Sequence, residues 1–379
     1  MTRRGYPFPP STPHRVRRRI EHADFHTTWR SELRLWNSTT LRVAATTLLV
    51  LLLAFPVIAD SVWLRIATVA LITAIGAMSL TLLTGVAGQL SLGHAAFIGV
   101  GAYSAAFVTD VVGISFWWSL PLAMALTGVL GLAVAPIALR VRGLYLAVVT
   151  LGLVFLFQHL FRNWTSVTGG VGGARVEAPT IFGIDLLRGG ELGGVTVQPF
   201  QGFYLVALLA ALTTYLVLRN LTRSQMGRDM AAVRDDDLAA AVVGVRVFRA
   251  KAHAFVVSSA FAGLAGTLLG GLQRFVGYDQ WGLHLSIEYL VMVVLGGIGV
   301  IGAAAVGAVF VTVMPELLDR IAPVVPLLTA EGVDGLTPAR ASVILFGVLV
   351  AGVMVAEPSG MYGLWVRVKR YFTSWPFTY

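Results

Sequence analysis

Polar side chains with hydrogen-bonding capacity lie inside an otherwise apolar, glycine-rich segment. Gln89, Ser91 and His94 belong to GVAGQLSLGHAAFIGVGAY, residues 85–103, and Tyr103 ends the same segment. Irregular backbone at membrane depth is tolerated only where it is buried in protein or lines a watered cavity. These side chains could therefore supply hydrogen bonds along a solute path. The alternative is an ordinary turn whose glycines serve close packing.

One acidic side chain adds to these candidates. Glu288 stands near the start of the apolar run LSIEYLVMVVLGGIGVIG, where a carboxylate is costly unless it is paired or lies at the interface. Asp110 and Glu288 are both placed near the outer ends of apolar stretches, so a proton relay through the membrane is poorly supplied. The candidate path residues are Gln89, Ser91, His94, Tyr103 and Glu288.

Several other kinds of chemistry have no residues to support them. The chain contains no cysteine and no Gly-Lys pair, so it has no disulfide, no thiolate site and no ATP-binding P-loop of its own. No HExxH, no GxSxG and no His/Asp/Glu cluster with metal spacing occurs. We therefore expect no catalytic residue, no metal and no cofactor bound by this chain.

The composition indicates where the chain resides. Of its 379 residues, 56% are hydrophobic and 12% are charged, whereas soluble domains carry about 25% charged residues. Soluble enzymes and nucleic-acid-binding domains are therefore poor interpretations. A polytopic membrane protein remains, and its length is best divided by the roughly 20 residues of one membrane-spanning helix.

Ten apolar stretches predict an all-α fold of about ten transmembrane helices, within a range of eight to ten. The glycines at 296, 297, 299 and 302 interrupt the run from 287 to 318, which could form two short helices or one helix with a re-entrant turn. The stretches are 41–59, 62–84, 94–110, 117–138, 144–161, 202–219, 252–275, 287–301, 302–318 and 340–356.

The cationic residues predict the topology. The net charge is +9, and placing the N-terminus inside puts 21 of the 28 Lys and Arg residues on inner segments. This distribution satisfies the positive-inside rule. We expect a transmembrane domain over 41–357, a flexible basic cytoplasmic tail over 1–40, a cytoplasmic tail over 358–379, and both termini inside. The inner segments between the tails are 85–93, 139–143 and 220–251.

Two connections are too long to be simple turns. The outer loop 162–201, with Thr168, Gly169 and Gly170, could dock an external protein or gate a path, or it could be a floppy surface loop. The inner loop 220–251 contains three aspartates, residues 235–237, that can cap a helix beginning near Leu238 and ending at Gly244. Such a small-residue helix suits a partner's groove, and a solvated charged loop is the alternative.

A parallel internal repeat is weakly indicated. At an offset of 208 residues, Gly88, Ala95, Ala96 and Gly99 match Gly296, Ala303, Ala304 and Gly307. Four identities in twelve positions carry little weight in a composition rich in Gly and Ala. Both segments nevertheless fall at an inner turn of the predicted topology, as a parallel repeat requires.

Six segments in order resemble the LivM-type permease of branched-chain amino-acid ABC transporters. They are GVAGQLSLGHAAFIGVGAY, LRVRGLYLAVVTLG, FRNWTSVTGG, GRDMAAVRDDDLAAAVVGV, LSIEYLVMVVLGGIG and EPSGMYGL, across roughly 70–363. The resemblance implies a bacterial inner-membrane complex of two related permeases, two ATPase subunits that bind ATP-Mg, and an external solute-binding protein.

The resemblance also implies that the inner loop engages the ATPase. The generic pattern Glu-Ala-Ala-x-x-x-Gly reads here as Leu238-Ala239-Ala240-x-x-x-Gly244, so the glutamate is replaced. The candidate coupling residues are Arg223, Gly227, Arg228, Asp229, Arg234, Asp235, Ala239, Ala240 and Gly244.

Three alternatives stay open at this point. The same machinery could carry urea or short amides. A proton- or sodium-driven secondary transporter would need buried acids and no docking helix, which is the opposite of what this sequence offers. A non-transporting membrane scaffold would leave the polar, glycine-rich turn at 85–94 unexplained.

Overall fold

The computed structural model describes residues 39–141, 143–181, 183–192, 195–321, 338–357 and 360–373. The chain divides into two units, one ending at Phe55 and the other beginning at Pro56. The described part of the first unit lies in helix α3 (Thr39–Ile58), which continues through Pro56. The predicted N-terminal tail, apart from its last two residues, and Arg142 lie outside the described residues.

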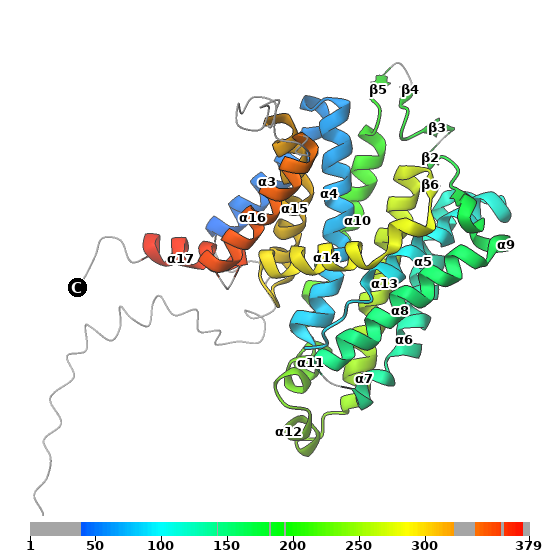
Figure 1. Cartoon of the computed structure of the whole chain (residues 1–379). Helices are drawn as coiled ribbons and strands as arrows, with labels where there is room; N and C mark the ends of the chain where they lie inside the picture. The colour runs from blue at the N-terminus through cyan, green and yellow to red at the C-terminus, as the bar shows by residue number, and fades with distance from the viewer. Residues whose placement is uncertain are drawn as a thin grey trace, which may run out of the picture. The chain divides into compact units, whose positions relative to one another are not determined.

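The second unit consists almost entirely of helices (Figure 1). The longer ones are α4 (Ser61–Thr81), α5 (His94–Ala106), α6 (Ser119–Val134), α8 (Leu144–Asn163), α10 (Gln201–Arg223), α11 (Gln225–Asp235), α13 (Val247–Gln273), α14 (Leu283–Gly296), α15 (Ile301–Ile321), α16 (Pro338–Ala356) and α17 (Gly360–Thr373). Shorter helical segments are η1 (Leu82–Val86), η2 (Phe107–Val111), η3 (Phe116–Trp118), α7 (Ile137–Arg140), α9 (Thr165–Thr168), η4 (Gly170–Gly172), α12 (Asp237–Val242) and η5 (Tyr278–Trp281).

Five short strands of the described residues lie in the predicted outer loop, and a sixth follows α13. They form three antiparallel pairs, so the fold class stays all-α. The pairs are β1 (Ala174–Arg175) with β6 (Phe275–Val276), β2 (Thr180–Ile181) with β3 (Ile184–Asp185), and β4 (Gly190–Leu192) with β5 (Val195–Val197).

Helices α4 and α13 form the centre of the second unit. Helix α13 packs against α4, α5 and α6, and α4 also packs against α10 and α15. Their apolar side chains, including Ile75, Met78 and Phe255, are completely or almost completely buried. Helix α8 instead exposes Tyr145, Leu156 and other apolar residues, as a surface that faces lipid or another apolar partner requires.

Small residues allow α5 and α13 to approach each other at backbone distance. A Cβ atom added to Gly101 would overlap the carbonyl oxygen of Gly263, and one added to Gly266 would overlap the carbonyl oxygen of Ile98. Helices in membranes gain little from hydrophobic burial against each other, so they rely on such close van der Waals packing. The α5–α13 contact therefore depends on glycine on both helices.

The predicted count of about ten spans is not confirmed. A helix forms at each of the ten apolar stretches, but six of the described helices are long and apolar enough to cross a membrane, or seven if α16 and α17, bent by 52° at their junction, are one span. Helix α14 has 14 residues. At 1.5 Å per residue it is about 20 Å long, short of the roughly 30 Å hydrocarbon core, whereas the 13 residues of α5 continue directly into η2.

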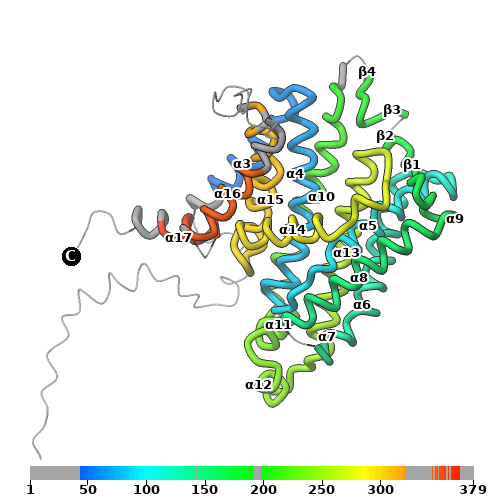
Figure 2. Tube along the Cα trace, in the orientation of Figure 1, coloured from blue at the N-terminus to red at the C-terminus, as the bar shows by residue number. Residues whose placement is uncertain are grey.

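The glycine-rich run from 287 to 318 forms two helices. Helix α14 ends at Gly296, and α15 begins at Ile301. Between them, Gly297 and Gly299 have φ of 131° and 90°. Figure 2 shows α14 lying across α4 and α15, which it contacts. Helix α5 begins at His94 and α15 begins at Ile301. The separation between these two helix starts agrees within one residue with the 208-residue offset of the predicted repeat.

We predict that Gly266→Ala destabilises the protein more than Gly152→Ala. Both changes gain about 1 kcal/mol of helix propensity. At position 266 the new Cβ overlaps backbone of α5, and overpacking costs about 1–3 kcal/mol, whereas at position 152 on α8 it meets no atom within 4 Å. Thermal unfolding in detergent measures the difference. Equal midpoints for the two variants would contradict the close α5–α13 packing.

Candidate functional site

The glycine-rich turn before α5 is buried and internally bonded. Gln89 Nε2 donates to the carbonyl oxygen of Ala87 at 3.1 Å, and Ser91 Oγ accepts from the N–H of Gly93 at 3.2 Å. Both side chains are buried. In this conformation Gln89 and Ser91 therefore stabilise the turn with bonds to their own segment.

His94 joins a buried polar cluster between α4, α5 and α14. Its Nε2 lies 3.0 Å from the carbonyl oxygen of Gly76 and 3.1 Å from Ser79 Oγ, and its ring meets the Tyr289 ring edge-on at 5.6 Å. Ser258 of α13 donates to the carbonyl oxygen of Ser79 at 2.8 Å. Four helices thus meet at one polar layer inside an apolar bundle.

The start of α5 is also satisfied by neighbouring helices. The N–H of Ala95 donates to Ser286 Oγ at 3.1 Å, and the N–H of Leu92 donates to Thr150 Oγ1 at 2.9 Å. The first N–H groups of a helix need such partners because they have none inside the helix. Because Ser286 Oγ already accepts the N–H of Ala95, this N–H is not available to a solute in the present conformation.

Among the buried side-chain polar atoms without a hydrogen-bond partner in the described residues, three lie beside α5. They are the hydroxyls of Tyr103 and Tyr289 and the Nε1 of Trp281. The Tyr103 ring packs on Phe161 at 4.5 Å, and Trp281 and Phe161 both border Gly99. A buried polar group without a partner costs about 1–3 kcal/mol, so each calls for an explanation. We interpret them as groups available to water or a solute.

Sequence reasoning selected Tyr103 but missed Trp281 and Tyr289. Tyr289 directly follows Glu288, and that adjacency was the available signal. Glu288 itself is half-buried on α14 and lies one residue from the polar layer that His94 and Tyr289 form.

The inner loop folds into two helices, α11 and α12. Helix α12 begins one residue before the predicted Leu238, and its cap is Asp236, whose Oδ1 accepts from the N–H groups of Leu238 and Ala239 at 2.7 and 3.0 Å. Gly244 follows the helix with φ of 90°, a conformation that favours glycine. Helix α11 was not predicted, although it contains Gly227, Arg228, Asp229, Arg234 and Asp235 of the candidate coupling residues.

A buried ion pair anchors α12 to the bundle. Lys251 Nζ lies 2.8 Å from Asp237 Oδ2 and donates to the carbonyl oxygen of Ala138 at 3.2 Å. Both side chains are nearly buried, at 3% and 10% exposure. Sequence reasoning treated Lys251 as one cation among many, because its partners lie 14 and 113 residues away.

Arg234 connects α11 to both glycine-rich turns. Its Nη1 donates to the carbonyl oxygen of Gly85 at 3.1 Å, and its side chain packs on Gly88. A Cβ added to Gly85 would in turn overlap the backbone of Gly299. The guanidinium also binds Asp235 at 2.9 Å, an exposed pair. Arg234, Gly85 and Gly299 therefore form a continuous line of contact.

The side of α12 that faces away from the Lys251–Asp237 pair is apolar and exposed. Leu238, Val242 and Val243 expose 71%, 88% and 77% of their surfaces, whereas Ala240 is buried against Val233 and Ala250. Arg223, Arg228 and Ala239 are also exposed. Three neighbouring exposed apolar side chains are typical of a surface that another protein covers.

Three of the predicted inner segments meet at this end of the bundle. A cavity of about 360 Å³ is lined by residues from 88–89, from 233–238 and by Gly143 and Lys251. Separately, the predicted outer segments meet one another. Trp117 Nε1 donates to the carbonyl oxygen of Thr180 at 2.8 Å, the N–H of Glu177 donates to Thr109 Oγ1 at 3.2 Å, and β1 pairs with β6.

The outer loop is folded in its described part. Thr168 Oγ1 donates to the carbonyl oxygens of Phe161 and Trp164 at 2.6 and 2.8 Å and accepts from the N–H of Gly170 at 3.2 Å. Gly169 and Gly170 have φ of 70° and 61°. The three predicted residues thus make the turn that directs the chain from α8 into β1.

The comparison with known proteins decides the family. A family described as "Branched-chain amino acid transport system / permease component" matches residues 62–355. The chain belongs to this family. The permease is 36% identical over 284 residues to the high-affinity branched-chain amino acid transport system permease protein LivM of Escherichia coli, covering 72% of the permease and 67% of LivM.

More distant relatives carry a second permease name. The permease is 25% identical over 301 residues to LivH of Escherichia coli, also a high-affinity branched-chain amino acid transport system permease protein, covering 76% of the permease and 90% of LivH. No solved structure matches the permease significantly. The permease is accordingly a multi-pass membrane protein of LivM type.

We predict that Asp237→Asn loosens α12, whereas Asp235→Asn does not. Removing one partner of a buried ion pair costs about 3–5 kcal/mol because the other charge stays buried. The exposed Arg234–Asp235 pair is worth about 0–1 kcal/mol. Hydrogen–deuterium exchange of residues 236–243 measures the loosening. If the two variants exchange alike, Lys251 does not anchor α12.

Proposed function

We propose that the permease is one membrane subunit of an ATP-driven importer for branched-chain amino acids. The observation that carries this proposal is the 36% identity to LivM across most of the chain. The similarity to LivH further supports a pair of related permeases. In this proposal two partner subunits bind and hydrolyse ATP-Mg, an external solute-binding protein delivers the substrate, and both termini of the permease are cytoplasmic.

The segment 220–251 is proposed to receive the movement of an ATPase subunit. Its exposed apolar tip, Leu238, Val242 and Val243, suits a groove on a partner. The ion pair of Lys251 and Asp237 and the bond from Arg234 to Gly85 hold the other side to the bundle. A helix anchored in this way moves the bundle when its tip is pushed.

The movement is proposed to reach two irregular segments through Arg234: η1 before α5, and the glycines between α14 and α15. Gly85 belongs to η1, a π-helical turn, and touches Gly299 in the break between α14 and α15. π-helical turns are often found at functional sites and weaken the regular hydrogen-bond pattern. A shift of α11 would therefore act first on this π-helical turn and on the break between α14 and α15.

The proposed path runs beside α5. His94, Tyr103, Tyr289 and Trp281 supply its polar groups, and apolar neighbours such as Phe161 suit an aliphatic side chain. In the present conformation these groups are buried, so the path is closed. Binding-protein docking and ATPase closure would shift the permease between inward- and outward-facing states.

Leu238→Glu should abolish coupling without unfolding the permease. The new carboxylate would lie on the exposed apolar tip, where a partner surface would have to desolvate it. Co-purification of the ATPase subunits and leucine uptake by proteoliposomes should both fall at least about tenfold, as a desolvation cost above 1.4 kcal/mol requires. Gln225→Glu adds the same charge to the exposed start of α11 and should leave both unchanged.

Gly244→Arg tests the same segment independently. It places a side chain where φ is 90° and disturbs the end of α12. Normal uptake together with normal ATPase stimulation in Gly244→Arg or Leu238→Glu would rule out coupling through α12.

Arg234→Gln should uncouple ATP hydrolysis from transport. The complex should assemble and hydrolyse ATP, because the tip of α12 is untouched, while uptake per ATP falls as the bond to Gly85 is lost. Arg249→Gln is the control, because it removes the same charge from an exposed position of the same inner loop. An unchanged ratio of uptake to hydrolysis in Arg234→Gln would exclude this relay.

The substrate requires its own measurement. Urea and short amides are the alternative cargo for the same machinery, and the external binding protein is expected to select among them. Uptake of radiolabelled leucine, isoleucine and urea by the wild-type complex distinguishes branched-chain amino acids from the alternative cargo. Uptake of urea without leucine would replace the branched-chain assignment and leave the permease role intact.

A further inference from the structure

Helix α17 is amphipathic and takes no part in the proposed path or coupling segment. Apolar residues recur at positions 361, 364, 365, 368 and 372, the spacing of one side of a helix, whereas the cations at 367, 369 and 370 lie outside this stripe. The sequence contains no acidic residue from 358 to 379. An apolar stripe with aromatic residues, bordered by cations, is typical of a helix that lies in the membrane–water interface.

The apolar stripe of α17 extends beyond the bundle. Met361, at its start, packs against the hydrophobic core. Leu364 and Trp365 follow one turn later on the same side, and they expose 43% and 63% of their surfaces. Among the described residues, the bundle therefore covers the start of the stripe and leaves these two side chains to another apolar environment.

The start of α17 lies against the break between α14 and α15. A Cβ atom added to Gly360 would lie 2.9 Å from the backbone nitrogen of Gly297. Gly299 in the same break touches Gly85, and Arg234 of α11 donates to the carbonyl oxygen of Gly85. Helix α17 therefore begins at the end of the bundle that carries α11, which is the predicted inner side.

An ion pair connects α17 to the end of α16. Arg367 Nη2 lies 2.6 Å from Glu357 Oε2, and the side chain of Glu357 is 7% exposed. The pair bridges the 52° bend between the two helices. Helix α16 alone has 19 residues, about 29 Å, so it crosses nearly the whole hydrocarbon core. Helix α17 is therefore not needed to complete a crossing.

We propose that α17 lies on the inner leaflet and binds the headgroups of anionic phospholipids, with Leu364 and Trp365 among the acyl chains. Charge complementarity selects this partner, because the segment contains cations and no acid, and anionic lipids attract such segments. Since Arg367 pairs with Glu357, Lys369 and Arg370 are the cations assigned to the headgroups. The proposal goes beyond the proposed function and places a lipid contact beside the break after α14.

Single cysteines measure how α17 lies, because the chain has no cysteine of its own. Tyr362→Cys, Leu364→Cys, Trp365→Cys and Val366→Cys would each carry a nitroxide in the transporter complex in nanodiscs. Collisions with oxygen and with a water-soluble nickel complex report depth. A helix on the surface places positions 364 and 365 deeper than both 362 and 366. A depth that changes steadily from 362 to 366 would show a crossing helix and overturn the proposal.

Lipid preference is measured on the same helix. A fluorophore on Trp365→Cys is quenched by nitroxide-bearing phosphatidylglycerol or phosphatidylcholine in nanodiscs that hold the complex, and the anionic lipid should be preferred. Lys369→Gln and Arg370→Gln should each lower this preference about fivefold. Raising the salt concentration should lower it as well, because salt screens exposed charges. Equal quenching by the two lipids in the unmodified cationic background would refute the lipid site.

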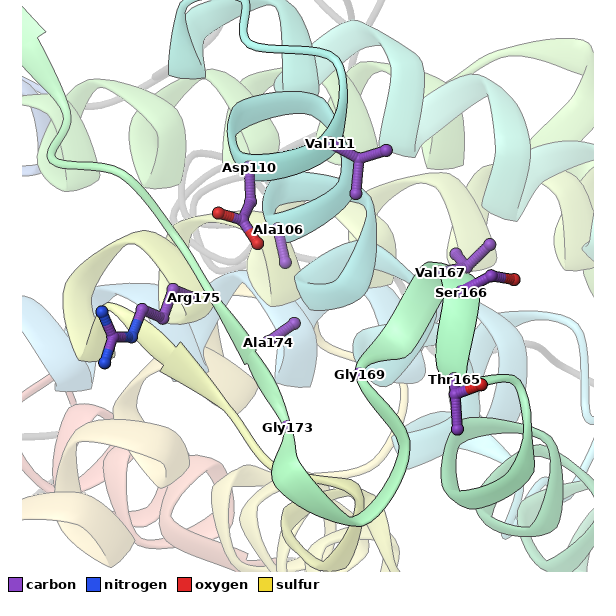
Figure 3. A pocket seen from close by; sticks show the side chains of 10 residues that line it. All are labelled: Ala106, Asp110, Val111, Thr165, Ser166, Val167, Gly169, Gly173, Ala174 and Arg175. Carbon is purple, nitrogen blue, oxygen red and sulfur yellow. The ribbon is translucent and has the colours of Figure 1, made fainter.

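Arg175→Gln is the matched control. It makes the same chemical change as Arg370→Gln at an exposed cation of the predicted outer loop. In Figure 3 the Arg175 side chain points away from the other residues that line a pocket of about 350 Å³ beside η2 and α9. Arg175→Gln should leave the lipid preference at position 365 unchanged. If it lowers that preference as much as Arg370→Gln does, the effect reflects net charge alone and the proposal fails.

An ATPase subunit is the other partner that the exposed stripe could contact. If neither lipid quenches the fluorophore at position 365 in the assembled complex, a protein covers the stripe and the proposal fails. Quenching by phosphatidylglycerol in that complex supports the lipid site. These measurements do not depend on the transported solute, so their failure leaves the proposed function intact, and a failure of leucine uptake leaves this inference intact.

Discussion

The irregular backbone between Gly85 and the start of α5 depends on hydrogen bonds from neighbouring elements, because the interior of a membrane offers no water to a free backbone group. The N–H groups at the start of α5 are bound by Ser286 and Thr150, and the carbonyl oxygen of Gly85 by Arg234. Each bond comes from a different helix. The irregular backbone is therefore stable only while α8, α11 and α14 hold their positions, and movement of any of them changes which groups are satisfied.

This dependence links the two ends of the permease. At the α12 end, Lys251 ties the coupling segment to Ala138 of α7, and Arg234 ties it to Gly85 of η1, before α5. At the other end, η2 continues α5 and binds the outer loop through Thr109. Between them α5 packs on α13 without room for a side chain at Gly266. A close-packed helix transmits displacement because its contacts cannot compress.

Unpartnered polar atoms mark where the bundle departs from the rule that buried groups are satisfied. Ser79, His94 and Ser286 complete their bonds, but the hydroxyls of Tyr103 and Tyr289 do not within the described residues. Satisfied groups fix the structure, whereas unsatisfied ones store free energy that a solute or water can recover. His94 of the first set and Tyr103 of the second both belong to α5, so one helix carries members of both sets.

The sequence by itself determined the membrane environment, the helical class, the family and the short helix near Leu238, because these follow from composition, local capping and ordered segments. Its count of about ten spans is not confirmed, since an apolar stretch does not reveal that α14 has only 14 residues. The tertiary structure decided the rest. Lys251 with Asp237 and Arg234 with Gly85 join positions that are 14 and 149 residues apart in the sequence. Such pairs arise from packing across helices, which no local pattern records.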